Sequence, residues 1–173
     1  HDHKKGKTWP VKYNRMFDMT NDSHHFRTKA ELEAEGCYAV APMHYKKGET
    51  LFLPLLQGRS IHQFNHRYGG VTVNPDSLMN PFLTLVSTSE QLANPDFYTE
   101  PQYWINTEVC PLLPPFLLTF RDISNVTNER TMISAIVSKS GAGNKLPVLL
   151  PEIDNDVLIL EMYIYFNTPA KFK

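Results

Sequence analysis

Six side chains able to hydrogen-bond with nucleic-acid bases crowd into one short stretch, directly after the apolar run Leu51–Leu56. They are Arg59, His62, Gln63, Asn65, His66 and Arg67. The guanidinium group of Arg pairs with guanine, and the amides of Asn and Gln pair with adenine, in a DNA major groove. A core strand would bury several of these groups without partners. The stretch between Gly58 and Gly69 therefore predicts an exposed recognition surface, and its residue types leave open an edge strand with a solvated turn.

Four cations in or near this stretch can neutralise phosphates, and affinity gained in this way falls as the salt concentration rises. They are Lys46, Lys47, Arg59 and Arg67. The charge distribution also favours an anionic partner for the first part of the chain. Residues 1–67 carry 11 Lys and Arg against 7 Asp and Glu, whereas residues 68–173 carry 6 against 11.

A second polar segment, residues 122–130 (DISNVTNER), has a similar inventory of amides, hydroxyls and charges. Within it we expect Asn128 and Arg130 to contact DNA. Arg121 and Asp122 are expected instead to form an ion pair that holds the turn.

The sequence gives little support for a metal site or for a catalytic nucleophile. His62 and His66 are four residues apart, which on a helix would place them on one face as a zinc pair. The flanking glycines shorten any helix there, and no third ligand lies at a recognised spacing. For a metal-dependent nuclease, Glu49 is the only nearby carboxylate. There is no Gly-x-Ser-x-Gly motif, and the glycines at 141 and 143 lack the spacing of a GxGxxG phosphate loop. We therefore assign no catalytic residue and no metal ligand.

The composition predicts a mixed α+β domain of short antiparallel or mixed strands, with one or two helices and long ordered loops. The 173 residues include 10 Phe, 8 Tyr and 13 Pro, which favours strands and ordered loops over a helical bundle. We expect a basic lead-in over residues 1–14 and a single domain over residues 15–173, read as a fragment of a larger protein. No apolar run approaches the ~20 residues that span a membrane, and we expect a cytoplasmic protein.

Local patterns place several elements. Thr28 and Glu31 have the spacing of a capping box and predict a helix over Lys29–Glu35, ended by Gly36. Residues 116–137 read as a hairpin, and residues 103–105 as an apolar anchor to the core. Val71–Asn94 is expected to be a loop with one short helical turn near its end. Val157–Phe166 is apolar throughout and is either a strand or a helix.

Five ordered blocks resemble a region of fused restriction–methyltransferase proteins, namely type IIG restriction enzymes and related methyltransferases of phage-defence systems. In the block Leu53–Tyr68, residues 54–68 read PLLQGRSIHQFNHRY. This segment is similar to the family pattern PLYEGKMIHQFDHRY. The other blocks are Arg15–Ser23 with Phe26–Ala34, Pro101–Trp104, Phe120–Thr131 and Gly143–Pro147. Departures are Asn65 in place of Asp, Arg59-Ser60 in place of Lys-Met, and a tail after Leu149 that lacks the expected helix pattern.

The resemblance implies a target-recognition fragment of an adenine-specific DNA methyltransferase, following the catalytic domain along the parent chain. In such proteins the catalytic domain flips an adenine and methylates it from S-adenosylmethionine. The implied partners are double-stranded DNA and that catalytic domain, and the implied cofactor belongs to the parent protein rather than to this chain. Because the shared blocks occur in enzymes with different targets, sequence specificity is expected from other loops such as Val71–Asn94.

Two further functions stay open. The first is a scaffold module of a phage-defence complex that packs the catalytic domain against partner subunits, which an exposed apolar patch around Phe64, Tyr68 and Trp104 would favour. The second is the small metal-dependent nuclease, which a metal ion on His62 and His66 would favour.

Overall fold

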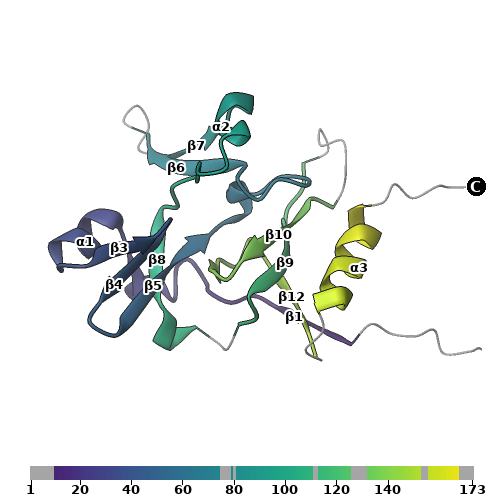
Figure 1. Cartoon of the computed structure of the whole chain (residues 1–173), viewed down its shortest axis with the longest axis horizontal. Coiled ribbons are helices and arrows are strands. Elements are labelled where there is room, and N and C mark those ends of the chain that lie inside the picture. Colours follow the sequence, from purple (N-terminus) through teal and green to yellow (C-terminus); the bar gives the residue numbers. More distant parts are fainter. Residues whose placement is uncertain are drawn as a thin grey trace, which may run out of the picture.

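Strands dominate the fold, and the predicted α+β class is confirmed: the described residues form twelve strands, mostly antiparallel, and three short α-helices (Figure 1). The computed structural model describes residues 10–74, 79, 81–110, 113–125, 132–152 and 156–167. Three single 3-10 turns are η1 (Ser23–His25), η2 (Gly58–Ser60) and η3 (Thr107–Val109).

The larger sheet is built around the apolar run, which forms β5 (Thr50–Leu56). Its strands lie in the order β2 (Phe26–Arg27), β8 (Tyr103–Asn106), β5, β4 (His44–Lys47) and β3 (Tyr38–Ala41), with β11 (Gly141–Ala142) paired in parallel to β5. Leu53 and Leu55 are almost fully buried, and Leu55 packs in a core cluster with Phe17, Phe26 and Ile105. Trp104 of β8 is only 2% exposed and donates its indole N–H to the carbonyl of Met43 at 2.8 Å. The expected anchor at residues 103–105 is therefore confirmed.

The smaller sheet contains the predicted hairpin. Its strands lie in the order β1 (Val11–Asn14), β12 (Val148–Pro151), β9 (Phe116–Phe120) and β10 (Ser134–Ser138). β9 and β10 pair antiparallel from Phe116–Ser138 to Phe120–Ser134, as expected for residues 116–137. β1, at the end of the expected lead-in, pairs with β12 along its whole length.

The apolar C-terminal run forms helix α3 (Asp156–Asn167), which packs against β9 and β10 at the end of the molecule opposite α1 (Figure 1). Ile159 and Met162 bury their side chains beside Leu118 of β9. A sheet with one apolar face must cover it, and a helix is the element that can do so from one short segment. No helix in the described part of the chain is both long and apolar enough to cross a membrane.

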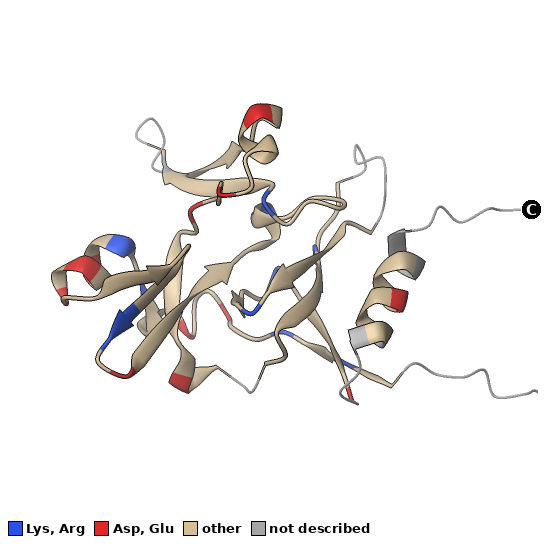
Figure 2. Ribbon diagram, viewed as in Figure 1, with Lys and Arg blue, Asp and Glu red and all other residues tan. Residues whose placement is uncertain are grey.

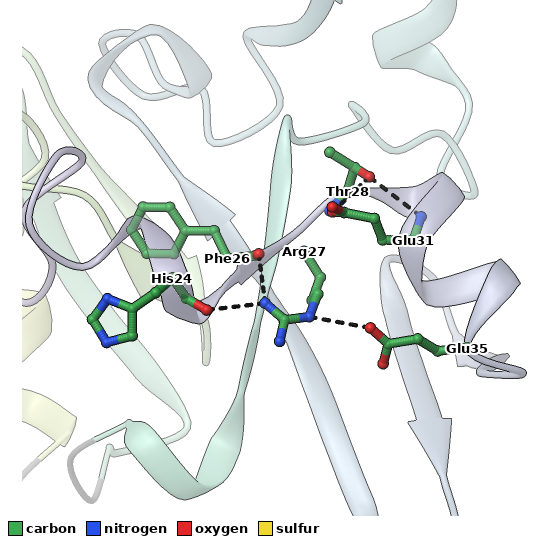
Figure 3. A network of polar contacts seen from close by, with 6 residues as sticks. All are labelled: His24, Phe26, Arg27, Thr28, Glu31 and Glu35. Carbon is green, nitrogen blue, oxygen red and sulfur yellow. Dashed lines mark hydrogen bonds and ion pairs between the residues drawn. The ribbon is translucent and has the colours of Figure 1, made fainter.

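Helix α1 (Lys29–Ala34) begins at the predicted capping box (Figure 3). The Glu31 amide donates to Thr28 Oγ1 at 3.3 Å, and the Thr28 amide donates to Glu31 Oε2 at 2.7 Å. The helix ends at Ala34, one residue before the predicted Glu35, and Gly36 follows its C-cap with a φ of 80° in the left-handed region, the terminator that was predicted. Arg27 ties the two ends of this segment together, because it donates to Glu35 and to the carbonyls of His24 and Phe26 (Figure 3).

The expectation of a loop over Val71–Asn94 is wrong for most of this segment. β6 (Gly69–Val73) and β7 (Phe82–Val86) form a two-stranded ribbon, and α2 (Ser89–Ala93) follows it. The Asn-Pro pairs at residues 74–75 and 80–81 are typical of turns, and they favoured a loop although the flanking strands carry alternating apolar residues. Gly69 is required at the start of the ribbon, because a Cβ there would lie 2.6 Å from Thr84 Cγ2 and 2.9 Å from the carbonyl oxygen of Arg59.

Candidate nucleic-acid interface

Three cations from segments far apart in the sequence, Arg59, Arg121 and Lys145, line one open pocket of about 420 Å³. Its other lining residues are Met19, Gln57, Gly58, Tyr68, Thr84, Val86, Ile123 and Gly143. The lining includes no carboxylate among the residues that the structure describes. A pocket with this charge is suited to an anion.

Arg59 reaches the pocket from η2, the turn directly after β5. The Gln57 amide donates to Ser60 Oγ at 3.1 Å, and the Ser60 amide donates to the Gln57 carbonyl at 2.8 Å, which together fix the turn. A Cβ on Gly58 would lie 2.8 Å from the carbonyl oxygen of Lys145, so only glycine allows η2 to approach that backbone. The guanidinium of Arg59 is half-buried and makes one long hydrogen bond, 3.4 Å, to the carbonyl of Phe82.

Arg121 forms the wall of the pocket. Its Nε donates to the carbonyl of Ile61 at 3.0 Å, and its guanidinium carbon lies 5.2 Å from the centre of the Tyr68 ring. Burial lowers the pKa of Arg121, and Tyr68 partly offsets this shift. The expected ion pair between Arg121 and Asp122 is replaced by other contacts. Asp122 is held by Arg15 at 2.7 Å and by Lys145 Nζ at 3.7 Å.

Among the described residues, the carboxylates of Asp18 and Asp122 belong to chain neighbours of pocket-lining residues. Asp122 is 17% exposed and is engaged by the two cations named above. Asp18 accepts hydrogen bonds from the amides of Thr20 and Asn21 and from Asn144 Nδ2, and the backbone hydrogen bond from Asn21 is the largest cause of its lowered pKa. Arg15, Arg59, Arg121 and Lys145 outnumber these two carboxylates, so the described residues in and next to the pocket carry a net positive charge.

The predicted recognition stretch continues from the pocket wall into a tight turn. The amide of His62 donates to the carbonyl of Asn65 at 2.8 Å, and the amide of Asn65 donates back to the carbonyl of His62 at 2.9 Å. Gln63 and Phe64 are the two residues at the tip. The His62 ring stacks on Tyr68 at 4.7 Å between centroids, and burial, then the charge of Arg121, lowers its pKa.

His66 follows this turn, and partial burial of its ring, then the charge of Arg67, lowers its pKa. Because the turn at residues 62–65 is not helical, His62 and His66 do not lie on one face of a helix. In the described part of the chain, no three residues of the types His, Cys, Asp and Glu gather to hold a metal ion.

Arg67 is engaged inside the fold. Its guanidinium donates to the carbonyls of Leu92, Asn94 and Phe97 at 2.9–3.0 Å, at the C-terminal end of α2. Its amide donates to Asn65 Oδ1 at 2.8 Å. Arg67 therefore fixes α2 beneath the turn and has few donors left for a ligand.

The remaining predicted site residues lie elsewhere. Lys46 and Lys47 belong to β4, at the far end of the molecule from α3 (Figures 1 and 2), and Lys46 Nζ lies 3.7 Å from a carboxylate oxygen of Glu49. Asn128 and Arg130 fall outside the described residues. The structure thus brings Arg59 and the 62–66 turn together and separates them from β4.

Sequence reasoning missed Arg121, Lys145, Gln57 and Tyr68 as pocket residues. The only signal that could have found them is that each lies within a block of the resemblance described above. Searches against protein-family models, curated proteins and solved structures found no match.

Proposed function

We propose that this chain is a target-recognition fragment of an adenine-specific DNA methyltransferase or fused restriction–modification enzyme, and that its cationic pocket grips a backbone phosphate of duplex DNA. The proposal rests on the sequence segments from which the pocket residues come. Gln57, Arg59 and Tyr68 come from one resembling block, Arg121 from a second and Lys145 from a third. Blocks that are separate in the sequence meet at a single cationic site.

Phosphate contacts are the role that suits such shared residues. They set the position of DNA on a protein and carry no sequence information, so enzymes with different targets can share them. In this chain Arg59 and Lys145 supply the charges that meet the phosphate, and Arg121 keeps the wall in place through Ile61 and Tyr68. The catalytic domain, S-adenosylmethionine and a cytoplasmic location belong to the proposal through the resemblance.

The test is DNA binding by the full chain at two salt concentrations. We expect the affinity for a short duplex to fall as salt rises, and Arg59→Ala/Lys145→Ala to reduce the slope of log affinity against log salt by about 1 for each charge that contacts a phosphate. The matched control is Lys46→Ala/Lys47→Ala, which removes the same number of charges from β4 and should leave most of the affinity. Binding that ignores salt, or that responds equally to both double variants, contradicts the proposed pocket.

A scaffold role is the second candidate, and one surface favours it. Helix α3 exposes an apolar stripe opposite its packed face: Val157, Leu160 and Ile164 are 62%, 51% and 57% exposed. The patch first expected for this role does not form, because Trp104 is buried. If α3 packs on the catalytic domain of the parent protein, Leu160→Glu/Ile164→Glu should prevent association with that domain. The pocket variant Arg59→Ala/Lys145→Ala should not affect this association.

A further inference from the structure

Phe64 is unusual in two ways: its backbone is in a conformation that is unfavourable for a large side chain, and its apolar side chain is exposed to water. Its φ of 59° lies in the left-handed region, where glycine and asparagine are at ease and a bulky residue is rare. Its aromatic ring is 59% exposed. A turn selected for stability alone would carry Gly or Asn at this position. Strain of this kind persists where the surrounding structure imposes it, and it concentrates at functional sites.

The turn is closed by its own backbone and held at its first end by the surrounding structure. Reciprocal hydrogen bonds between His62 and Asn65 close it. At its first end Arg121 holds the Ile61 carbonyl, and the His62 ring is stacked on Tyr68. Since Arg121 and Tyr68 also line the cationic pocket, the turn is mounted on the wall of that pocket.

The ring of Phe64 meets Tyr163 of α3 edge-to-face at 6.0 Å between centroids. This contact steadies the ring and leaves more than half of the side chain exposed. Hydrogen-bonding side chains flank it in the sequence at Gln63, Asn65 and His66. An apolar ring on a rigid mount, between polar neighbours and beside a cationic pocket, has the chemistry of a group that enters a stack of bases.

We propose that Phe64 is a wedge that inserts between adjacent base pairs of the DNA whose phosphate the pocket holds. This inference rests on the proposed function. The ring replaces part of the base stacking that its insertion breaks, and the phosphate contacts offset the rest. The closed turn and the edge-to-face contact with Tyr163 restrict the ring before DNA binds, so little conformational freedom is lost on insertion.

The test uses the full chain and a short duplex with 2-aminopurine at its TA steps, which unstack most easily. The fluorescence of 2-aminopurine rises when it leaves the stack, and we expect this rise when the wild-type chain binds. Phe64→Gly should abolish the rise and weaken binding about fivefold or more, as for the loss of one base–aromatic contact. Phe64→Trp should keep the rise. Phe116→Ala is the matched control, because it removes another exposed Phe, from β9, and should change neither signal.

The melting temperature separates a wedge from a structural anchor. Glycine relieves the left-handed strain, so Phe64→Gly should melt no lower than the wild-type chain if the ring serves DNA. A clearly lower melting temperature would mean that Phe64 is there to hold α3 through Tyr163, and it overturns the inference. An unchanged fluorescence rise in Phe64→Gly, with salt-dependent binding intact, overturns the wedge and leaves the phosphate pocket standing. A wild-type chain that does not bind the duplex overturns both.

Discussion

Two cationic regions of this protein differ in how their charges are brought together. In the first, Lys46 and Lys47 are neighbours in the sequence and lie on β4, with Lys46 half-buried and Lys47 exposed. In the second, Arg59, Arg121 and Lys145 are far apart in the sequence and meet at one pocket. The comparison shows that adjacency in the sequence is a poor guide to a built site. The side chain of Arg121 and the close approach of Gly58 to Lys145 fix the pocket, whereas the Lys46 ammonium lies only near Glu49, at 3.7 Å.

The first prediction breaks the pocket at its closest backbone approach, and we expect the largest effect there. Gly58→Ala places a Cβ 2.8 Å from the carbonyl oxygen of Lys145, so η2 must move away. Overpacking against backbone should cost about 2–3 kcal/mol of unfolding free energy and separate Arg59 from Lys145. Urea denaturation measures the stability, and salt-dependent DNA binding measures the pocket.

Gly48→Ala, in the turn after β4, is the matched control for that substitution. A Cβ on Gly48 meets nothing within 4 Å, and the only penalty is its φ of 57°. This should cost about 1 kcal/mol. If the two variants lose equal stability, the close approach at Gly58 is not what assembles the pocket.

The second prediction separates two arginines that the sequence presents as equivalent. Arg67→Ala leaves the carbonyls of Leu92, Asn94 and Phe97 without their donor and should cost about 2 kcal/mol. Arg67→Lys should restore little, because an ammonium group cannot span three carbonyls as the planar guanidinium does. Arg59→Ala should leave the unfolding free energy nearly unchanged and weaken DNA binding. Loss of DNA binding without loss of stability in Arg67→Ala would contradict the structural role of Arg67.

The contrast between Arg59 and Arg67 shows which features of the fold could be predicted from the sequence. Local signals sufficed where one segment decides the outcome: the capping box at Thr28, the hairpin of β9 and β10, and the buried anchor at Trp104. They failed where the outcome depends on a distant element. The guanidinium of Arg67 is engaged inside the fold because the end of α2 lies against it. The sequence predicted only a single helical turn within a loop at α2.

The pocket was beyond sequence reasoning for the same reason. Arg121 and Lys145 join Arg59 only because β9 and β10 pair, and because β11 adds to the edge of β5 and carries Gly143 with it. The run Val157–Phe166 could be resolved as a helix only once the sheet that it covers was known.

The third prediction concerns pH and the wall of the pocket. The pKa values of His62 and His66 are lowered by burial and then by Arg121 and Arg67 respectively, so the folded chain binds protons on these rings less readily than the unfolded chain. The unfolding free energy should therefore fall as the pH drops through and below the ordinary histidine pKa of 6.5, and rise towards neutral pH. Urea denaturation at several pH values measures this. His62→Gln/His66→Gln should flatten the dependence between pH 5 and 7 relative to the wild-type chain; an unchanged slope would place the titrating groups elsewhere in the fold.

The smallest effect is expected at the lysines of β4. Lys46 Nζ lies 3.7 Å from Glu49, whose side chain is fully exposed, and water screens such a pair almost completely. Lys46→Ala should therefore leave the melting temperature within the scatter of repeated scans, at low salt as well as at high salt. Its effect on DNA affinity should be small beside that of Lys145→Ala, because Lys145 shares with Arg59 and Arg121 a pocket that can fix the position of one phosphate, whereas Lys46 lies on β4 beside Glu49. If Lys46→Ala weakened DNA binding as much as Lys145→Ala, the DNA would have to contact β4 as well as the pocket. The pocket would then have no special role in DNA binding.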